Sequence, residues 1–469
     1  MVLLVVSTVL KILLVIAILL GIAPVLTWLD RRQSAMLQDR VGPHRGGIPL
    51  PSWAAYGIRG PLSWGAQAVA WISLALAAAA LVRGLVLALE PVGQLAFTLP
   101  LFGTFLVGPG ELIVLAVVGV LVFAFHRAAA WLMRNLVEGD RLTAFGLVHP
   151  AFDAVKMIFK EDFVPPKADK LLYALAPIIA LVPAFATFAV IPIGPAVYWG
   201  PAGDPFRYLG SVLSAPEAAA AAATVIPLQI ANVNVGILFV FAVAGLGIVG
   251  AAIAGYSSDN KYALLGGLRA ASQMVSYEVT LGLTLVGCFM IYNTLLLDGM
   301  VAWQQEHVWG IVVQPVACVM FFFAALAEMK RVPFDAPEGE SEIVAGYFLE
   351  YSGLKFGMFM TGEYVEHITS SAILVTLFFG GYHVPFLASD GFHFAWLGFD
   401  ILLYHWVVVL LQVVAFLVKV VLCILLQLQV RWTVPRLRYD QIQQLCWKIL
   451  LPLSLANIVV TGVVILLLQ

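Results

Sequence analysis

The sequence predicts an all-α, polytopic membrane protein that forms a single integral membrane domain over residues 1–469. Three observations carry this prediction. Hydrophobic residues make up 62% of the chain and charged residues only 11%. The mean hydropathy is +0.98, and the apolar residues fall into long runs. Soluble domains carry roughly 25% charged residues, so a chain this apolar could not cover a globular surface with polar groups.

The apolar runs define the expected elements, because a spanning helix needs about 20 predominantly apolar residues. The first run is too long and apolar for a signal peptide and has no small-residue cleavage site before Asp30, so we expect it to be retained. About ten transmembrane helices follow from this pattern. The candidate spans are roughly residues 2–27, 64–88, 111–133, 171–192, 232–255, 277–297, 311–327, 356–381, 401–427 and 449–468.

Two of these runs differ from lipid-facing helices. The run at 311–327 is short and ends at Glu328. The run at 356–381 contains three ionisable residues, Glu363, Glu366 and His367. Ionisable groups inside a span are costly unless they face the protein interior or a water-filled cavity. We therefore expect both segments to line a cavity.

Lysine and arginine gather in alternate loops, which predicts the orientation. One set of loops contains Arg31, Arg32, Arg40, Arg45, Arg141, Lys156, Lys160, Lys167, Lys170, Lys261, Arg269, Lys330, Arg331, Lys355, Arg431, Arg436, Arg438 and Lys448. The other set, which includes a long loop at 193–231, is nearly free of cations; Arg83 and Arg207 are the exceptions. The cation-rich loops should be cytoplasmic, with both termini on the outer side of the membrane.

Composition also excludes several classes of function. The formal net charge of −2 offers no basic patch for nucleic acid. The four cysteines are not paired at metal-ligand spacing, so we predict no zinc or iron–sulfur site: Cys288, Cys318, Cys423 and Cys446. The chain has no phosphate-binding glycine motif for NADH. We expect no metal or flavin in this chain and no redox activity from the chain alone.

The most informative stretch is 328–366, where acidic residues lie between and within apolar segments. A solvated acidic loop is the alternative interpretation. Against it, aromatic and aliphatic residues interleave with the acids, and Glu328 and Glu363 fall at or within spans. Glu278 lies at the start of another span. Buried carboxylates that are close together cannot all ionise and therefore share protons, as a proton path requires.

The same stretch carries a resemblance to a known family. Residues 327–364, AEMKRVPFDAPEGESEIVAGYFLEYSGLKFGMFMTGEY, closely resemble a characteristic loop of the quinone-site membrane subunit of proton-pumping NADH-quinone oxidoreductase (respiratory complex I), lettered H in bacteria. Four other segments look like the same family: TWLDRRQSAMLQDRVGPHR at 27–45, FGLVHPAFDAVKMIFKEDFVPP at 145–166, YSSDNKYALLGGLRAASQMVSYEV at 256–279 and PRLRYDQIQQLCWKILLP at 435–452.

The resemblance implies a translocase subunit in an assembly that transfers electrons from NADH to a quinone such as ubiquinone and pumps protons. It implies hydrophilic-arm and membrane-arm complex I subunits as partners, besides membrane lipid and the quinone substrate. The implied proton-coupling line is Glu278, Glu328, Asp335, Glu338, Glu340, Glu342 and Glu350. The implied quinone-tunnel residues are Arg31, Arg32, Arg40, Arg45, Asp153 and Phe334. Positive-inside anchoring is an equal alternative for each of these arginines.

The chain departs from the family pattern in two places. Asp30 stands where the family usually has Glu, which puts its role at the tunnel mouth in doubt. Residues 48–142 form an inserted segment between two family-like stretches, and they contain two of the predicted spans. Two extra spans return the chain to the same side, which leaves the eight spans that the family implies.

Two other hypotheses remain open. The chain could be the equivalent membrane subunit of a membrane-bound hydrogenase, although the matches at 27–45 and 145–166 favour the quinone enzyme. A free-standing proton-linked transporter would also use buried acids, but it should show inverted repeats, and none is convincing here. Co-purification with an NADH dehydrogenase arm, with a hydrogenase arm or with nothing separates the three.

Overall fold

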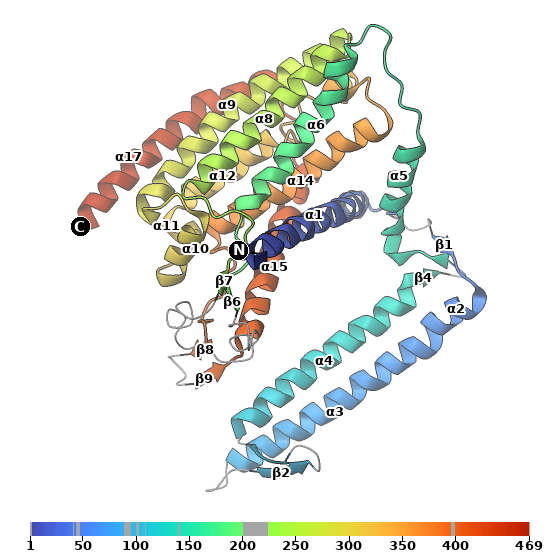
Figure 1. Cartoon of the computed structure of the whole chain (residues 1–469), viewed down its shortest axis with the longest axis vertical. Helices are drawn as coiled ribbons and strands as arrows, with labels where there is room; N and C mark the ends of the chain where they lie inside the picture. The colour runs from blue at the N-terminus through green and yellow to red at the C-terminus, as the bar shows by residue number, and fades with distance from the viewer. Residues whose placement is uncertain are drawn as a thin grey trace. The chain divides into compact units, whose positions relative to one another are not determined.

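The computed structural model confirms the all-α polytopic fold (Figure 1). It describes residues 2–40, 42–43, 47–88, 95–99, 103–107, 109–138, 141–199, 224–394 and 399–468. Arg45 and most of the loop predicted at 193–231 lie outside these ranges, and the side chain of Glu340 is likewise not described. Seven helical segments within the described ranges are long and apolar enough to cross a membrane. The other predicted spans form helices too.

The chain divides into two compact units, Met1–Leu37 with Ala154–Gln469 (unit 1) and Gln38–Asp153 (unit 2). Within the described residues, unit 1 contains eight long helices that follow the family-like spans. They are α1 (Val2–Leu37), α6 (Lys170–Thr187), α8 (Gly236–Ser257), α9 (Lys261–Tyr292), α12 (Pro315–Glu328), α14 (Gly353–Phe378), α15 (His405–Thr433) and α17 (Leu451–Leu468). Shorter helices α10 (Leu297–Glu306), α11 (Gly310–Val313), α13 (Glu340–Ile343) and α16 (Tyr439–Gln444) lie between them.

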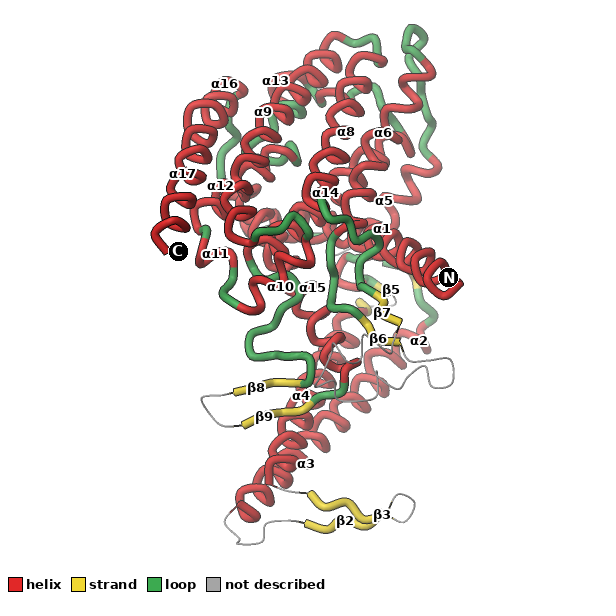
Figure 2. Tube along the Cα trace, turned by 60° about the vertical axis from the view of Figure 1, so that its left-hand side comes forward, coloured by secondary structure: helices red, strands yellow, loops and turns green. Residues whose placement is uncertain are grey.

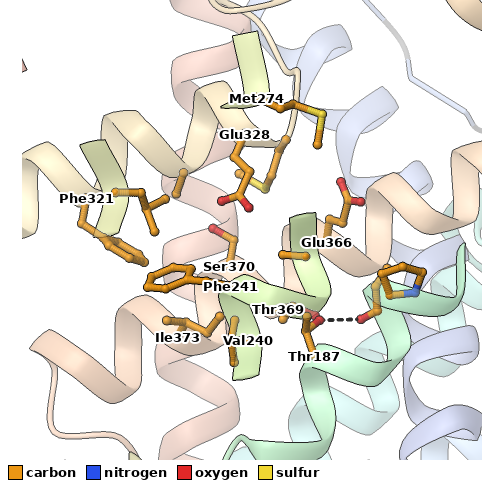
Figure 3. Close-up of a pocket in the computed structure, with 16 residues that line it drawn as sticks. Thr187, Val240, Phe241, Met274, Phe321, Glu328, Glu366, Thr369, Ser370 and Ile373 are labelled. Atoms are coloured by element: carbon orange, nitrogen blue, oxygen red, sulfur yellow. Dashed lines mark hydrogen bonds between the residues drawn. The ribbon is translucent and has the colours of Figure 1, made fainter. Parts of the chain in front are cut away.

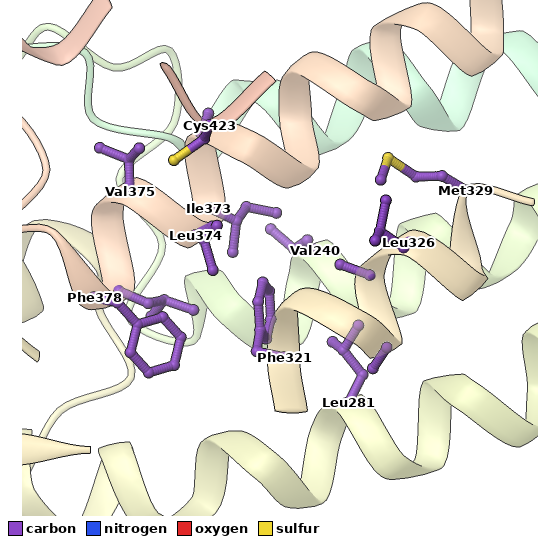
Figure 4. Packing of buried hydrophobic residues seen from close by; sticks show 14 of the residues in the cluster. Val240, Leu281, Phe321, Leu326, Met329, Ile373, Leu374, Val375, Phe378 and Cys423 are labelled. Carbon is purple, nitrogen blue, oxygen red and sulfur yellow. The ribbon is translucent and has the colours of Figure 1, made fainter. Parts of the chain in front are cut away.

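Four of the long helices form a layer in which α6, α8, α9 and α17 run side by side (Figure 1). Small residues permit the close approach: a Cβ added at Gly250 of α8 would lie 2.7 Å from the backbone nitrogen of Ala180 in α6. Helices α12 and α14 pack against this layer. Phe321 of α12 and Phe378 of α14 lie 5.8 Å apart between ring centroids, in the cluster of buried apolar residues shown in Figure 4.

The strands of unit 1 are short and form two hairpins (Figure 2). Strand β6 (Val197–Trp199) pairs with β7 (Thr224–Ile226), and β8 (Gly391–Phe394) pairs with β9 (Phe399–Leu402), both antiparallel. They follow the ends of α6 and α14. All four cysteines of the chain are buried and unpaired.

Unit 2 is built on the hairpin of α3 (Ser63–Ala88) and α4 (Pro109–Leu136), preceded by α2 (Ser52–Gly57). Strands β2 (Leu95–Leu99) and β3 (Gly103–Val107) pair between the two long helices. A small sheet joins β1 (Ile48–Pro49), β5 (Arg141–Leu142) and β4 (Val137–Glu138). Unit 2 also includes the first half of α5 (Val148–Phe159). It encloses the segment 48–142, whose status as an insertion stays a prediction.

Two helix boundaries differ clearly from the prediction. Helix α1 continues to Leu37, whereas the first span was predicted to end near 27. Helix α9 begins at Lys261, whereas hydropathy placed the start of this span near 277. Its first half contains Arg269 and Gln273, which lower the hydropathy without breaking the helix. Asn260 caps it, because the side-chain oxygen accepts a hydrogen bond from the backbone nitrogen of Tyr262 at 2.9 Å.

Candidate functional site

One buried side chain, Gln273, holds the start of the loop between α12 and α14, which comprises residues 329–352. The Gln273 amide nitrogen, from α9, donates to the Ala327 carbonyl at 2.8 Å and to the Phe334 carbonyl at 2.7 Å. Lys330 has a left-handed backbone with φ of 56°, which turns the chain back after α12. The acidic stretch is thus a packed loop rather than a solvated one.

Gly346 fixes the second half of this loop. Its φ of +67° lies in the left-handed region, and an added Cβ would overlap the carbonyl oxygen of Pro337. This glycine lets the following residue, Tyr347, point inward, where it is 1% exposed. The Tyr347 ring packs edge-on against Phe348 and Phe359, with centroids 4.9 Å and 5.6 Å away.

A pocket of about 330 Å³, which we call the loop pocket, opens beside this loop. Its lining combines acids, arginines and aromatic rings: Val332, Asp335, Glu338, Ala345, Phe348, Arg431, Trp432 and Arg436. Arg436 donates a charged hydrogen bond to Asp335 Oδ2. The other oxygen of that carboxylate, Oδ1, and Glu338 Oε1 are buried and have no hydrogen-bond partner.

Both acids of the loop pocket have raised pKa values. Burial raises the pKa of Asp335 to about 6, although the Arg436 guanidinium offsets part of the rise. Burial, together with the nearby Glu363 carboxylate, raises the pKa of Glu338 well above its usual range. Groups whose pKa values are shifted toward the working pH are candidates for proton transfer.

Asp30 of α1 lies at the edge of the loop pocket. Its carboxylate accepts a hydrogen bond from Arg431 Nη1 at 2.5 Å and another from Trp432 Nε1 at 2.8 Å. The Asp30 carboxylate therefore reaches both of these lining residues. This contact ties α1 to the end of α15.

A buried ion pair lies deeper in unit 1. Arg331 Nη2 and Glu363 Oε2 are 3.1 Å apart, and their side chains are 7% and 3% exposed. The Tyr347 hydroxyl donates to Glu363 Oε1 at 3.3 Å, and Lys330 Nζ donates to the Tyr347 hydroxyl at 3.5 Å. Because Glu338 also interacts with Glu363, this group connects electrostatically to the loop pocket.

A second space, the bundle cavity, lies between α6, α8, α9, α12 and α14 and measures about 50 Å³. Figure 3 shows the carboxylates of Glu328, at the end of α12, and Glu366, on α14, both directed into it. The remaining lining is mostly apolar, with Thr187, Thr369 and Ser370 as the hydroxyl side chains. The two spans that carry charges in the sequence therefore both line a cavity.

The other acids of the predicted line are more scattered. Glu278 of α9 faces α8, where a Cβ added at Gly245 would lie 3.0 Å from its Oε1 atom. Glu342 is 42% exposed and pairs with Arg269 at 2.6 Å. Glu350 accepts a hydrogen bond from the Asn260 amide at 2.6 Å.

The described quinone-tunnel candidates belong to different units, and each is placed within its own unit. The Phe334 side chain is 1% exposed and packs 5.6 Å from the ring of Tyr277, in the core. Arg31 is exposed and Arg32 half-buried near the end of α1. Arg40 and Asp153 belong to unit 2. Their role in a quinone tunnel stays a prediction.

The prediction left out the cations and the tyrosine that join the acids, and it did not place Glu363 in the acidic line. These residues are Lys330, Arg331, Tyr347, Arg431 and Arg436. One signal was present in the sequence: Lys330 and Arg331 follow directly on a span that ends in a glutamate, where a buried cation needs a partner.

Comparison with known proteins agrees with this arrangement. Residues 110–462 match the family model described as NADH dehydrogenase. The chain is 40% identical over 350 residues to the NADH-quinone oxidoreductase subunit lettered H and numbered 1 of Geobacter metallireducens, which covers 75% of this chain and 92% of that protein. It is 38% identical over 342 residues to the subunit of the same letter and number in Cytophaga hutchinsonii, which covers 73% and 90% respectively.

A further relative is the NADH-quinone oxidoreductase subunit lettered H and numbered 2 of Syntrophobacter fumaroxidans, which is 39% identical over 366 residues, 76% of this chain and 96% of that protein. The loop pocket, the buried ion pair and the bundle cavity all lie within the segment that matches the family model. The chain therefore belongs to the NADH dehydrogenase family, as a membrane subunit of NADH-quinone oxidoreductase of the type lettered H.

Proposed function

We propose that this chain forms part of the quinone site of a proton-pumping NADH-quinone oxidoreductase and couples quinone reduction to proton translocation through buried carboxylates. One observation carries the proposal. The loop pocket and the bundle cavity lie at the two ends of a buried set of polar groups: Glu338, Glu363, Arg331, Tyr347 and Lys330.

The loop pocket has the chemistry that a quinone headgroup requires. Arg431 and Arg436 can donate hydrogen bonds to quinone carbonyl oxygens, while Phe348 and Trp432 offer ring faces. Reduction of a quinone to a quinol takes up two electrons and two protons. The electrons would come from the hydrophilic arm, since the sequence predicts no electron carrier in this chain. Asp335 and Glu338 are placed to supply protons, because their pKa values are raised.

A charge change in the loop pocket would be felt deeper in the bundle. Proton loss from Glu338 places a negative charge next to Glu363, which already pairs with Arg331. Charges interact more strongly in a low-dielectric interior than in water. The ion pair between Arg331 and Glu363 would then weaken. The hydrogen bonds of Tyr347 and Lys330 would change with it and carry the electrostatic effect toward Glu328. Glu278, Glu340, Glu342 and Glu350 would extend this path toward the membrane-arm subunits.

The loop pocket would face the cytoplasm of a bacterial cell, with both termini on the periplasmic side of the inner membrane. The distribution of lysine and arginine supports this orientation, since the cation-rich segments predicted from the sequence include those around the ends of α1, α8, α12 and α15. The relatives described above are all NADH-quinone oxidoreductase subunits, which favours this function over a hydrogenase subunit or a transporter.

Two variants of the assembled complex test the two halves of the proposal. Ala345→Phe fills the loop pocket, and it should raise the apparent quinone KM without changing the protons pumped per NADH. Glu328→Gln keeps the shape of the side chain but cannot titrate. It should lower turnover and pumping while the quinone KM stays nearly unchanged.

An unchanged quinone KM in Ala345→Phe, with assembly confirmed, would show that quinone does not bind in the loop pocket. Full pumping in Glu328→Gln would remove the bundle cavity from the coupling path. Both outcomes are read from quinone titration and proton uptake in reconstituted vesicles.

A further inference from the structure

Glu366 is an ionisable residue inside a membrane span that the predicted acidic line does not include. It lies on α14, one turn after Glu363, and its carboxylate enters the bundle cavity from the side opposite Glu328 (Figure 3). Helix α12 carries the one carboxylate and helix α14 the other. Ionisable groups at membrane depth are rare and functional by default.

The bundle cavity is suited to hold water between these two carboxylates. Its volume of about 50 Å³ exceeds the ~10–15 Å³ that a single water needs. The Ser370 hydroxyl oxygen, on the same face of α14, is buried and has no hydrogen-bond partner. A water in this space would find partners in Ser370 and in both carboxylates.

The charges around Glu366 do not neutralise it by direct pairing. The ionisable groups that act on it electrostatically are Lys330, Arg331 and Glu363. Arg331 is paired with Glu363 at 3.1 Å, and Lys330 Nζ bonds to the Tyr347 hydroxyl. On the neighbouring helices, the carboxylates of Glu366 and Glu278 act electrostatically on Glu328. Among the described residues, no lysine or arginine forms an ion pair with Glu328 or Glu366.

We propose that Glu366 is a second proton-carrying carboxylate, which shares one proton with Glu328 through water in the bundle cavity. Two ionised carboxylates that face one small cavity would repel, and one shared proton removes that repulsion. In the transfer step the O–H bond of one carboxyl breaks, the proton moves through the water, and an O–H bond forms on the other. The net charge of the pair does not change.

This inference rests on the proposed function, because it extends the coupling path by one site. The path would then continue along α14 instead of ending at α12. Glu366 would act together with Glu328 and not as a replacement for it.

The test uses the assembled complex with Glu366→Gln, which keeps the side-chain size and removes the titration. Glu306→Gln is the matched control, since Glu306 is exposed on α10 and lies in neither cavity. Protons pumped per NADH are measured in vesicles. Infrared difference spectra on quinone reduction record protonated carboxyl groups. We expect loss of pumping and loss of one carboxyl band in Glu366→Gln, with both retained in Glu306→Gln.

Glu366→Asp provides a second variant that keeps the acid and moves it by one methylene. It should restore part of the pumping and shift the carboxyl band. Wild-type pumping and an unchanged band in Glu366→Gln would overturn the inference. If Glu366→Gln does not assemble, an unshifted band in Glu366→Asp overturns it instead.

Glu328→Gln separates this inference from the proposed function. If Glu328→Gln loses pumping while Glu366→Gln keeps it, only the role of Glu366 fails. If both variants pump fully, the coupling path through the bundle cavity fails as well.

Discussion

Removal of one partner from the buried Arg331–Glu363 pair should be costly, because the other charge is left unpaired. Arg331→Gln leaves the Glu363 carboxylate, only 3% exposed, without its ion-pair partner. Breaking a buried pair in this way costs about 3–5 kcal/mol. Since about 1.4 kcal/mol is a factor of ten, the ratio of folded to unfolded subunit should fall by at least ~10²-fold. Glu363→Gln should cost a similar amount by stranding Arg331.

The double variant Arg331→Gln/Glu363→Gln contains no stranded charge. It should therefore be more stable than either single variant, and the shortfall from additivity measures the interaction of the pair. The assay is the midpoint of thermal inactivation of the purified complex, together with the fraction of complex that assembles. Arg269→Gln is the control: it breaks the more exposed Arg269–Glu342 pair and should cost only ~0–1 kcal/mol. A double variant no more stable than the worse single variant would refute the reasoning.

Three further predictions follow from the structure. Arg436→Gln removes a cation that lowers the pKa of Asp335, so this pKa rises above about 6. Because Asp335 supplies a proton in its protonated form, the alkaline limb of the turnover–pH profile moves to higher pH; a limb that stays in place or moves down contradicts the assignment. A cysteine at Asn234 should react with an impermeant reagent from the periplasmic side and one at Asp440 should not, against a background in which the four native cysteines are buried; the reverse pattern would invert the orientation. Deletion of residues 52–140, joined by a short linker, should leave measurable NADH:quinone activity, because the described part of this segment contributes no residue to the loop pocket or the bundle cavity; an assembled but inactive variant would place it in the site.

The fold could be predicted well because the bilayer imposes one simple rule on every span. Each run of about 20 apolar residues became a helix, including the short run that ends at Glu328. The rule failed at the end of α1, which continues to Leu37, and at the start of α9, where the helix begins before the apolar run and hydropathy has no signal for it. Capping by Asn260 was the available signal.

The site could be predicted only as a set of acids. Which acid meets which cation depends on contacts between distant segments, such as Arg436 with Asp335, 101 residues apart, and Arg431 with Asp30, 401 residues apart. The role of Tyr347 depends on the left-handed turn at Gly346 and on packing between rings. Neither periodicity nor composition contains that information.

The central claim is that a buried set of polar groups connects the loop pocket to the bundle cavity. Tyr347 joins two members of this set, since its hydroxyl contacts both Lys330 and Glu363. Tyr347→Phe removes that hydroxyl and keeps the ring. Tyr351→Phe is the matched control, because it removes a hydroxyl from the same loop that contacts Ser257 instead.

The most direct measurement is the number of protons pumped per NADH by vesicles that contain each assembled variant. The account predicts a lower ratio for Tyr347→Phe, at an unchanged quinone KM, and a wild-type ratio for Tyr351→Phe. A wild-type ratio in Tyr347→Phe would contradict the account.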